Sequence, residues 1–219
     1  MKASAKIALL LSTLLLSCAL LASCGGNEPT NADTTEEATP ESTPYDDREI
    51  LSSVTLERYT GLTVELLDKT ETKEAALWRT LTGNAEITAY PEEQLRYYES
   101  SIRQSYRYLA DLRDIPYEEL CDALGITEET VAAEARDLVR GDMVRRYVTL
   151  HAGIALSDEE ISTLFDRYAE KIAEDHGYTV SYAKTNLREL ILETMLRDKT
   201  TQYLLERNEF VPYTEATAG

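Results

Sequence analysis

The chain has 219 residues, of which 43% are hydrophobic and 28% charged, and this is enough for one or two domains with an ordinary hydrophobic core. Its 22 basic and 40 acidic side chains give a formal net charge of −18, which excludes a nucleic-acid binder as the default interpretation because phosphate contacts need an excess of Lys and Arg. Nine glycines and six prolines exclude a collagen-like chain and leave few turn residues for an all-β protein.

The N-terminus has the pattern of a secretory signal peptide. Lys2 and Lys6 precede an apolar run, residues 7–22, that is shorter than the roughly 20 residues of a membrane-spanning helix. The run ends in Leu21-Ala22-Ser23-Cys24-Gly25, which resembles the lipobox of bacterial lipoproteins. This resemblance implies a signal peptide over residues 1–23, lipidation of Cys24, and an extracytoplasmic protein held on the cell membrane by its lipid.

The sequence gives less support for a function of the other two cysteines, Cys18 and Cys121. Cys18 ends a poorer lipobox with a shorter apolar core, and a buried N-terminal helix of a cytosolic protein is the remaining alternative for this segment. Cys121 is then the only thiol of the mature chain, so no intrachain disulfide can form. It lies on an apolar helix face with Leu120 and Leu124, which predicts a core residue and not a nucleophile.

The next segments predict a tether and then a short β element. Residues 25–49 carry eight acids and one Arg with hardly an aliphatic side chain, so we predict that residues 24–49 form a disordered, acidic tether. Apolar residues then alternate at even positions on both sides of Gly61, between Val54 and Leu66. This alternation predicts a β-hairpin or an extended segment within residues 50–71 that packs against helices.

The remainder of the chain has helical periodicity and predicts a mainly α fold for residues 72–211, followed by a disordered tail at 212–219. Proline, Glu pairs, capping residues and glycines mark the helix ends. The predicted helices cover residues 72–81, 91–115, 117–124, 127–153, 157–176 and 181–206. The last of these is apolar on nearly every side from 190 to 196, which predicts the central core helix.

The order of these helices resembles the C-terminal, client-binding domain of trigger factor over residues 56–211. The similar segments are Tyr59–Glu65, Leu77-Trp78, Ala89-Tyr90-Pro91, Tyr117–Leu120, Gly125–Glu129, Ala135–Tyr147, Leu156–Ile161 and Leu190–Leu204. The peptide-binding domains of foldases of the PrsA and SurA types are similar to the same module. The resemblance implies an elongated helical domain with protruding arms that holds unfolded polypeptides.

Two departures from trigger factor limit what the resemblance implies. The chain has no room between Glu65 and Ala75 for the prolyl isomerase domain, and it lacks the ribosome-docking loop. We therefore expect a chaperone, or holdase, that binds unfolded or newly translocated polypeptides without ATP or isomerase activity. The alternatives are an envelope module with one dedicated protein partner and a degenerate member of the prolyl isomerase family.

Tyrosines are the candidate client-contact residues, since a tyrosine ring gives contact area while its hydroxyl stays wetted. We predict a contact stripe of Tyr97, Tyr106, Tyr108 and Tyr147, beside the alternative that these rings pack between helices. Tyr98 is expected in the core.

No catalytic, metal-binding or cofactor-binding residues are predicted. HExxH, GxSxG, P-loop and paired CxxC motifs are absent from the sequence. His151 and His176 fall near predicted helix C-termini, where a cation is favoured, and the paired glutamates fall in first helical turns. The sequence leaves the identity of the clients and the oligomeric state open.

Overall fold

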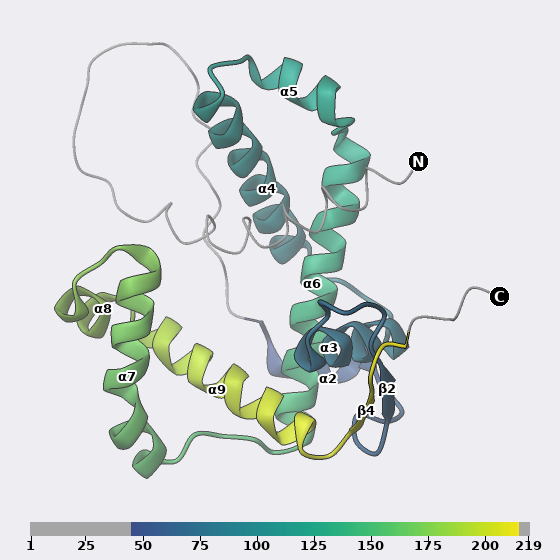
Figure 1. The fold of residues 1–219 in the computed structure, drawn as a ribbon, viewed down its shortest axis with the longest axis vertical. Helices are drawn as coiled ribbons and strands as arrows, with labels where there is room; N and C mark the ends of the chain where they lie inside the picture. Colours follow the sequence, from purple (N-terminus) through teal and green to yellow (C-terminus); the bar gives the residue numbers. More distant parts are fainter. Residues whose placement is uncertain (1–44, 215–219) are drawn as a thin grey trace. The chain divides into compact units, whose positions relative to one another are not determined.

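The computed structural model describes residues 45–214, which form a mainly helical protein, as predicted (Figure 1). Cys24 and the predicted signal peptide lie outside the described residues. In chain order the helices are α2 (Asp47–Ser53), α3 (Lys73–Asn84), α4 (Glu92–Leu112), α5 (Tyr117–Leu124), α6 (Glu128–His151), α7 (Asp158–His176), α8 (Val180–Asn186) and α9 (Arg188–Leu205). The strands are β1 (Val54–Thr55), β2 (Thr63–Glu65), β3 (Glu86–Ile87) and β4 (Glu209–Val211).

The chain folds into two compact units. Among the described residues, unit 1 contains residues 90–139, and unit 2 contains residues 45–89 and 140–214. Helix α6 belongs to both units, because the unit boundary falls between Val139 and Arg140. No helix within residues 45–214 has the length and hydropathy that crossing a bilayer requires.

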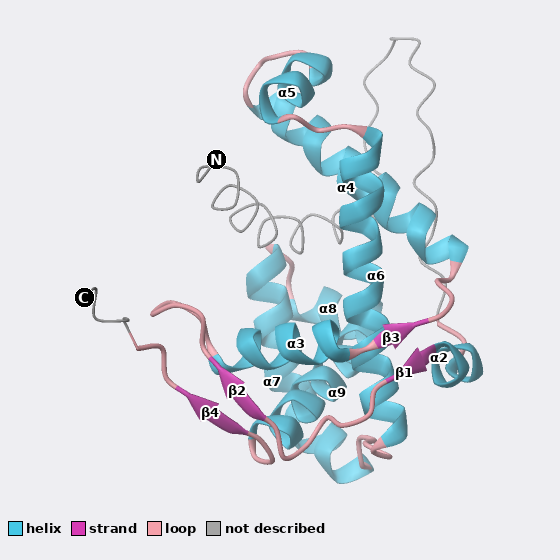
Figure 2. Ribbon diagram, turned by 90° about the vertical axis from the view of Figure 1, so that its right-hand side faces the viewer, coloured by secondary structure: helices cyan, strands magenta, loops and turns pink. Residues whose placement is uncertain are grey.

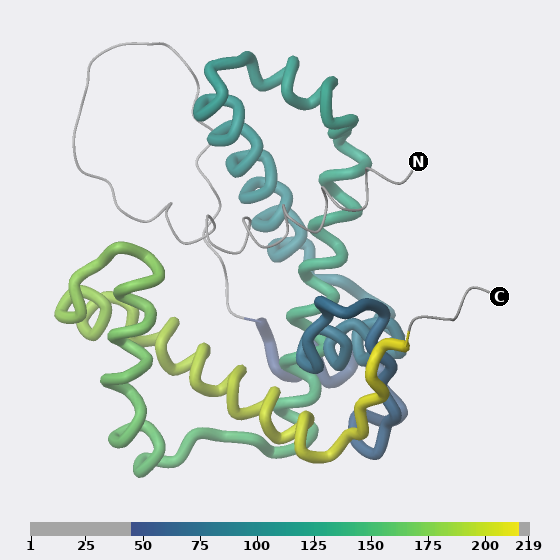
Figure 3. Tube along the Cα trace, in the orientation of Figure 1, coloured from purple at the N-terminus to yellow at the C-terminus, as the bar shows by residue number. Residues whose placement is uncertain are grey.

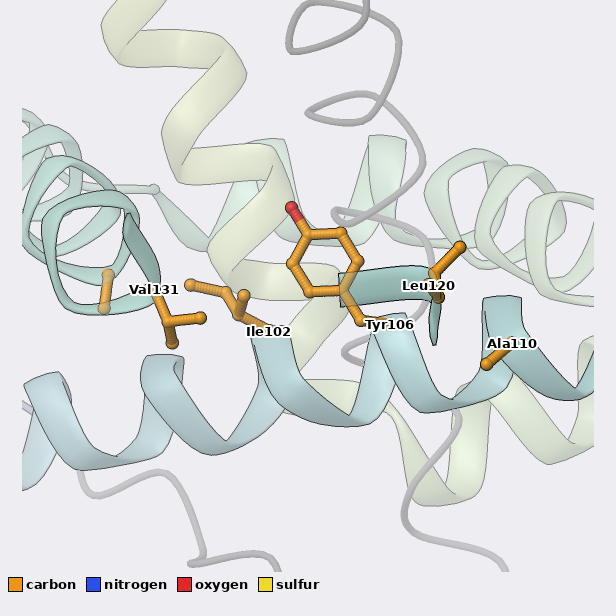
Figure 4. Packing of buried hydrophobic residues seen from close by; sticks show 6 residues of the cluster. Ile102, Tyr106, Ala110, Leu120 and Val131 are labelled. Carbon is orange, nitrogen blue, oxygen red and sulfur yellow. The ribbon is translucent and has the colours of Figure 1, made fainter. Parts of the chain in front are cut away.

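Unit 1 consists of α4, α5 and the first half of α6 around one hydrophobic cluster. The cluster contains Ile102, Tyr106, Ala110, Leu120, Val131 and Ala135, five of which are labelled in Figure 4. Gly125 ends α5 with φ +69°, and Thr127 caps α6 because its hydroxyl accepts from the Thr130 N–H at 3.2 Å. Both boundaries were predicted. Full burial of a side chain such as Leu120 contributes about 1.5–3 kcal/mol to folding.

Helices α7, α8 and α9 of unit 2 form a second hydrophobic cluster. Ala169 and Ile172 of α7 pack there against Ile191 and Met195 of α9. Figure 3 follows the chain from α7 through α8 into α9. The single helix predicted over residues 181–206 is wrong, since α8 and α9 are separated at Leu187, whose φ of −114° and ψ of 25° are not helical.

A capping box and an ion pair fix the start of α7. The Ser157 hydroxyl accepts from the Glu160 N–H at 3.2 Å, and a Glu160 carboxylate oxygen accepts from the Ser157 N–H at 2.7 Å. Lys199 of α9 donates to the same carboxylate at 2.7 Å and to the Ala155 carbonyl at 2.7 Å. The Lys199 hydrogen bond and the Ser157 N–H hold the pKa of Glu160 at about 2.

This low pKa predicts a loss of stability in acid. Because the folded-state pKa of Glu160 lies below its unfolded value of 4.5, its contribution is complete above pH 4.5 and disappears as the pH falls toward 2. Glu160→Gln is expected to lower the urea midpoint at pH 6 and to bring it close to the wild-type midpoint at pH 2. A variant midpoint that stays below wild type by the same amount at both pH values contradicts the assignment.

The second half of α6 forms the centre of the other part of unit 2. Met143, Val144 and Val148 are fully buried. The Trp78 indole N–H of α3 donates to the Thr201 hydroxyl of α9 at 3.2 Å, and the hydroxyls of Thr149 and Thr200 lie 3.0 Å apart. These bonds connect α3 and α6 to α9, and they satisfy polar groups that burial would otherwise leave unpaired.

The predicted hairpin around Gly61 is wrong, although its strand alternation is correct. β1 pairs with β3 in an antiparallel ladder, and β2 pairs with β4 in a parallel ladder (Figure 2). Val54 and Val64 are both buried, as their even positions predict. Gly61 has φ +68°, and its N–H donates to the Arg207 carbonyl at 2.8 Å, so the turn aligns β2 with a distant strand and not with β1.

The predicted tether boundary at residue 49 also requires correction. Asp46 caps α2 by accepting from the Arg48 N–H at 2.8 Å, so residues 46–49 belong to a capped helix and the predicted extended segment begins after Ser53. Asp47 forms an ion pair with Arg146 of α6 at 2.7 Å. The acidic composition that predicts disorder includes these two aspartates, which have specific partners in the folded chain.

Candidate functional site

The outer surface of α4 in unit 1 is the candidate site. Tyr97, Tyr108 and Leu112 lie within about 60° of one another around the helix axis, because they are 11 and 4 residues apart along a helix of 3.6 residues per turn. We call these three residues the α4 outer stripe. Tyr108 is 52% exposed and Leu112 is 64% exposed, while Tyr97 is half-buried and contacts Tyr98 edge to face at 5.4 Å.

The opposite face of α4 forms the core of unit 1. Ile102, Tyr106 and Ala110 follow one another at four-residue spacing and are all buried (Figure 4). Tyr98 is half-buried against the same cluster, close to its predicted place in the core. The helix thus divides its tyrosines between two faces, and its most exposed ring, that of Tyr108, lies on the outer face.

Tyr106 is therefore a core residue, and its place in the predicted contact stripe is wrong. Its hydroxyl donates to a Glu134 carboxylate oxygen at 3.4 Å, and burial raises the pKa of Tyr106 to about 12. Burial also raises the pKa of Glu134. Tyr106 follows Tyr97 by nine residues, which is two and a half turns, so the helical period itself places the two rings on opposite faces.

Tyr147 is also buried, and it belongs to unit 2. Its ring stacks on the His151 ring at 5.3 Å with an interplanar angle of 22°, and the Tyr59 hydroxyl lies 3.1 Å from His151 Nδ1. Its predicted role in the contact stripe is wrong, because only 9% of the residue is exposed. These aromatic contacts join the end of α6 to the loop before β2.

Leu112 is the residue that sequence reasoning missed. Its spacing from Leu109 predicts a core position, but α4 ends at Leu112 and the side chain is the most exposed large hydrophobic group among residues 45–214. Its exposure could have been predicted from the four-residue spacing of residues 102, 106 and 110, because Leu112 lies off the helix face that these buried residues share. The Cys121 side chain is likewise only half-buried, whereas its neighbour Leu120 is fully buried.

The arginines of α4 have partners within unit 1. Arg96 pairs with Glu92 at 3.6 Å, Arg103 pairs with Glu99 and with Glu128 of α6, and Arg107 lies over the Tyr117 ring at 5.5 Å. These arginines stabilise unit 1 through contacts with its own side chains. The aromatic and aliphatic side chains of the α4 outer stripe therefore have polar neighbours.

The described residues contain no group of three or more His, Cys, Asp or Glu side chains placed to hold a metal ion. His176 lies in the last turn of α7, and the pairs Glu118/Glu119, Glu128/Glu129 and Glu159/Glu160 lie in first helical turns, as predicted. These positions agree with helix-dipole pairing.

Comparisons with protein-family models, with curated proteins and with solved structures find no match to this chain.

Proposed function

We propose that this chain is a lipid-anchored, extracytoplasmic chaperone that binds unfolded or newly translocated polypeptides and releases them without ATP. The observation that carries the proposal is the α4 outer stripe, where Tyr108 and Leu112 are both more than half exposed on a well-packed helix. Exposed aromatic and aliphatic groups of this kind favour weak contacts with apolar segments. The net charge of −18 helps to keep a loaded complex soluble.

The anchor and the location of the protein are part of the same proposal. They rest on the Leu21-Ala22-Ser23-Cys24-Gly25 sequence at the end of an apolar run. The client-binding role rests in addition on the similarity of the helix order to the trigger factor C-terminal domain.

The test is suppression of aggregation by residues 24–219 with Cys24→Ser, which removes the lipidation site. We expect reduced light scattering from at least two unrelated aggregating clients. The double variant Tyr108→Ser/Leu112→Ser should need about tenfold more protein for the same suppression, because two exposed apolar contacts are lost. Leu51→Ser is the matched control, since Leu51 of α2 is 46% exposed and lies outside the α4 outer stripe.

Three outcomes contradict the proposal. Unchanged light scattering with all clients removes the chaperone function. Retention of one folded partner only, in a pull-down from envelope extract, favours the dedicated interaction module. Catalysis of prolyl-peptide isomerisation above the background rate favours the isomerase.

A further inference from the structure

The outer edge of β4 carries an unpaired main-chain donor and acceptor. The Glu209 N–H donates to the Leu62 carbonyl at 2.9 Å, and the Val211 carbonyl accepts from the Leu66 N–H at 3.1 Å. Phe210 lies between these two residues. In a parallel ladder, the residue between two that bond to the neighbouring strand points its own N–H and C=O away from that strand, so the main-chain groups of Phe210 point away from β2. Neither group has a hydrogen-bond partner among the described residues.

On the other edge of this ladder, which belongs to β2, one main-chain carbonyl is bound by an arginine side chain. Arg79 of α3 donates to the outward carbonyl of Glu65 at 2.8 Å, and Glu71 holds the same guanidinium at 2.8 Å. Figure 2 shows β4 as the outer strand, with β2 between it and the helices of unit 2. The Phe210 N–H and C=O therefore point away from both β2 and those helices.

Exposed apolar side chains gather beside this open edge. Val64 is buried, and Phe210, its partner in the ladder, is half-buried on the same face. Side chains alternate along a strand, so residues 63, 65, 209 and 211 point to the opposite, outward face. Val211 lies on that outward face and is 42% exposed, and Leu67 and Tyr213, two residues beyond the ends of β2 and β4, are 60% and 38% exposed. These three residues make up half of the six exposed large hydrophobic residues within residues 45–214, so exposed apolar groups are concentrated at and just after the ends of β2 and β4.

Two carboxylates lie on the same outward face. Glu65 and Glu209 are exposed and belong to no ion pair among the described residues. A bound segment that carries Lys or Arg is attracted to them, whereas a second copy of this chain brings its own carboxylates. Residues 25–44 contain acids and no Lys or Arg, so the same repulsion acts against that segment.

We propose that the β4 edge is a strand-addition site for an extended polypeptide segment in which apolar side chains alternate with Lys or Arg. Pairing with Phe210 gives main-chain hydrogen bonds, and Leu67, Val211 and Tyr213 contact the apolar side chains. The inference rests on the proposed function, since it assumes that the clients are unfolded chains with free backbone groups. It adds a second contact, in unit 2, to the one on α4.

Pro212 limits the length of the added strand. After Phe210, residue 212 is the next residue whose main-chain N–H would point to the open edge. It is a proline and has no N–H to donate there. The site therefore offers a short ladder, which favours weak and reversible binding and prevents strand pairing from spreading between copies.

The test uses residues 24–219 with Cys24→Ser and a fluorescein-labelled peptide of eight residues that alternates Val and Lys. We expect saturable binding by fluorescence anisotropy. Full backbone N-methylation of the peptide and the variant Val211→Lys should each weaken it about tenfold, through lost main-chain bonds and charge repulsion. Leu51→Lys is the matched control and should bind the peptide like wild type. Hydrogen exchange of the Phe210 amide, followed by NMR, should slow about tenfold or more at saturating peptide.

Each alternative outcome overturns the inference. The N-methylated peptide could bind as tightly as the unmodified one, or hydrogen exchange of the Phe210 amide could be unchanged in the bound state. The Phe210 amide could also be protected already in the free chain, which would mean that a segment of the protein itself occupies the edge. Absence of peptide binding with intact suppression of client aggregation removes this site and leaves the proposed function standing. Peptide binding without any suppression removes the proposed function.

Discussion

Tyr106→Ser is expected to lower the free energy of unfolding of unit 1 by about 3 kcal/mol. The ring is 7% exposed and packs with Ile102, Ala110 and Leu120, so its removal leaves a cavity and unpairs the half-buried Glu134 carboxylate. Native-state hydrogen exchange of the Ala110 amide measures the effect within unit 1, because Trp78, the single tryptophan, lies in unit 2.

Tyr108→Ser is the matched control for this prediction. The same substitution two residues later removes a ring that is 52% exposed, and it should change the free energy of unfolding by less than about 0.5 kcal/mol. Tyr106→Phe should destabilise much less than Tyr106→Ser. It should also raise the pKa of Glu134 further, since the Tyr106 hydroxyl lowers that pKa. Equal destabilisation by the two serine variants would contradict the division of α4 into inner and outer faces.

Arg140→Met is expected to lower the free energy of unfolding of unit 2 by about 2–3 kcal/mol. The Arg140 guanidinium donates to the Thr82 carbonyl at 2.9 Å and to the Ala85 carbonyl, so it satisfies the C-terminal end of α3. Methionine keeps most of the aliphatic stem and removes both donors. Urea unfolding followed by Trp78 fluorescence reports the change directly, since Trp78 lies on α3.

The control for Arg140→Met is Arg48→Met. Arg48 is an exposed arginine of α2 whose side chain forms no hydrogen bond or ion pair with the described residues, so its loss should change stability by less than about 0.5 kcal/mol. A stability loss for Arg140→Met no larger than that of the control would show that water satisfies the α3 carbonyls equally well.

Part of the candidate site was predictable and part was not. Tyr97 and Tyr108 were predicted as surface contacts, and the helical period alone would have excluded Tyr106, which lies half a turn away from Tyr97. No local pattern excludes Tyr147, because its burial depends on His151 and on Tyr59, a residue far away in the sequence. Leu112 is three residues after Leu109, which predicts a core residue, but it lies off the buried face that residues 102, 106 and 110 define and is exposed at the end of α4.

The open edge of β4, like the burial of Tyr147, depends on contacts between residues that are distant in the sequence. Alternation near residues 54–66 predicts strands and identifies their buried faces, but it carries no information about the partner strand. The pairing of β2 with β4 joins residues 63–65 to 209–211, so that the Glu65 carbonyl accepts from Arg79 on one edge and the Phe210 main-chain groups lie on the other edge. Only the folded chain defines which main-chain groups remain unpaired.

The sequence by itself determined the helical class and most helix ends, such as the Ser157 capping box and the Gly125 and Gly177 terminations. These features depend on residues within a few positions of one another, so local propensity and capping are sufficient to specify them. The tertiary structure decided the strand partners, the break at Leu187 and the exposure of each tyrosine. Those depend on contacts between residues distant in sequence, whose burial and hydrogen bonding outweigh local preference.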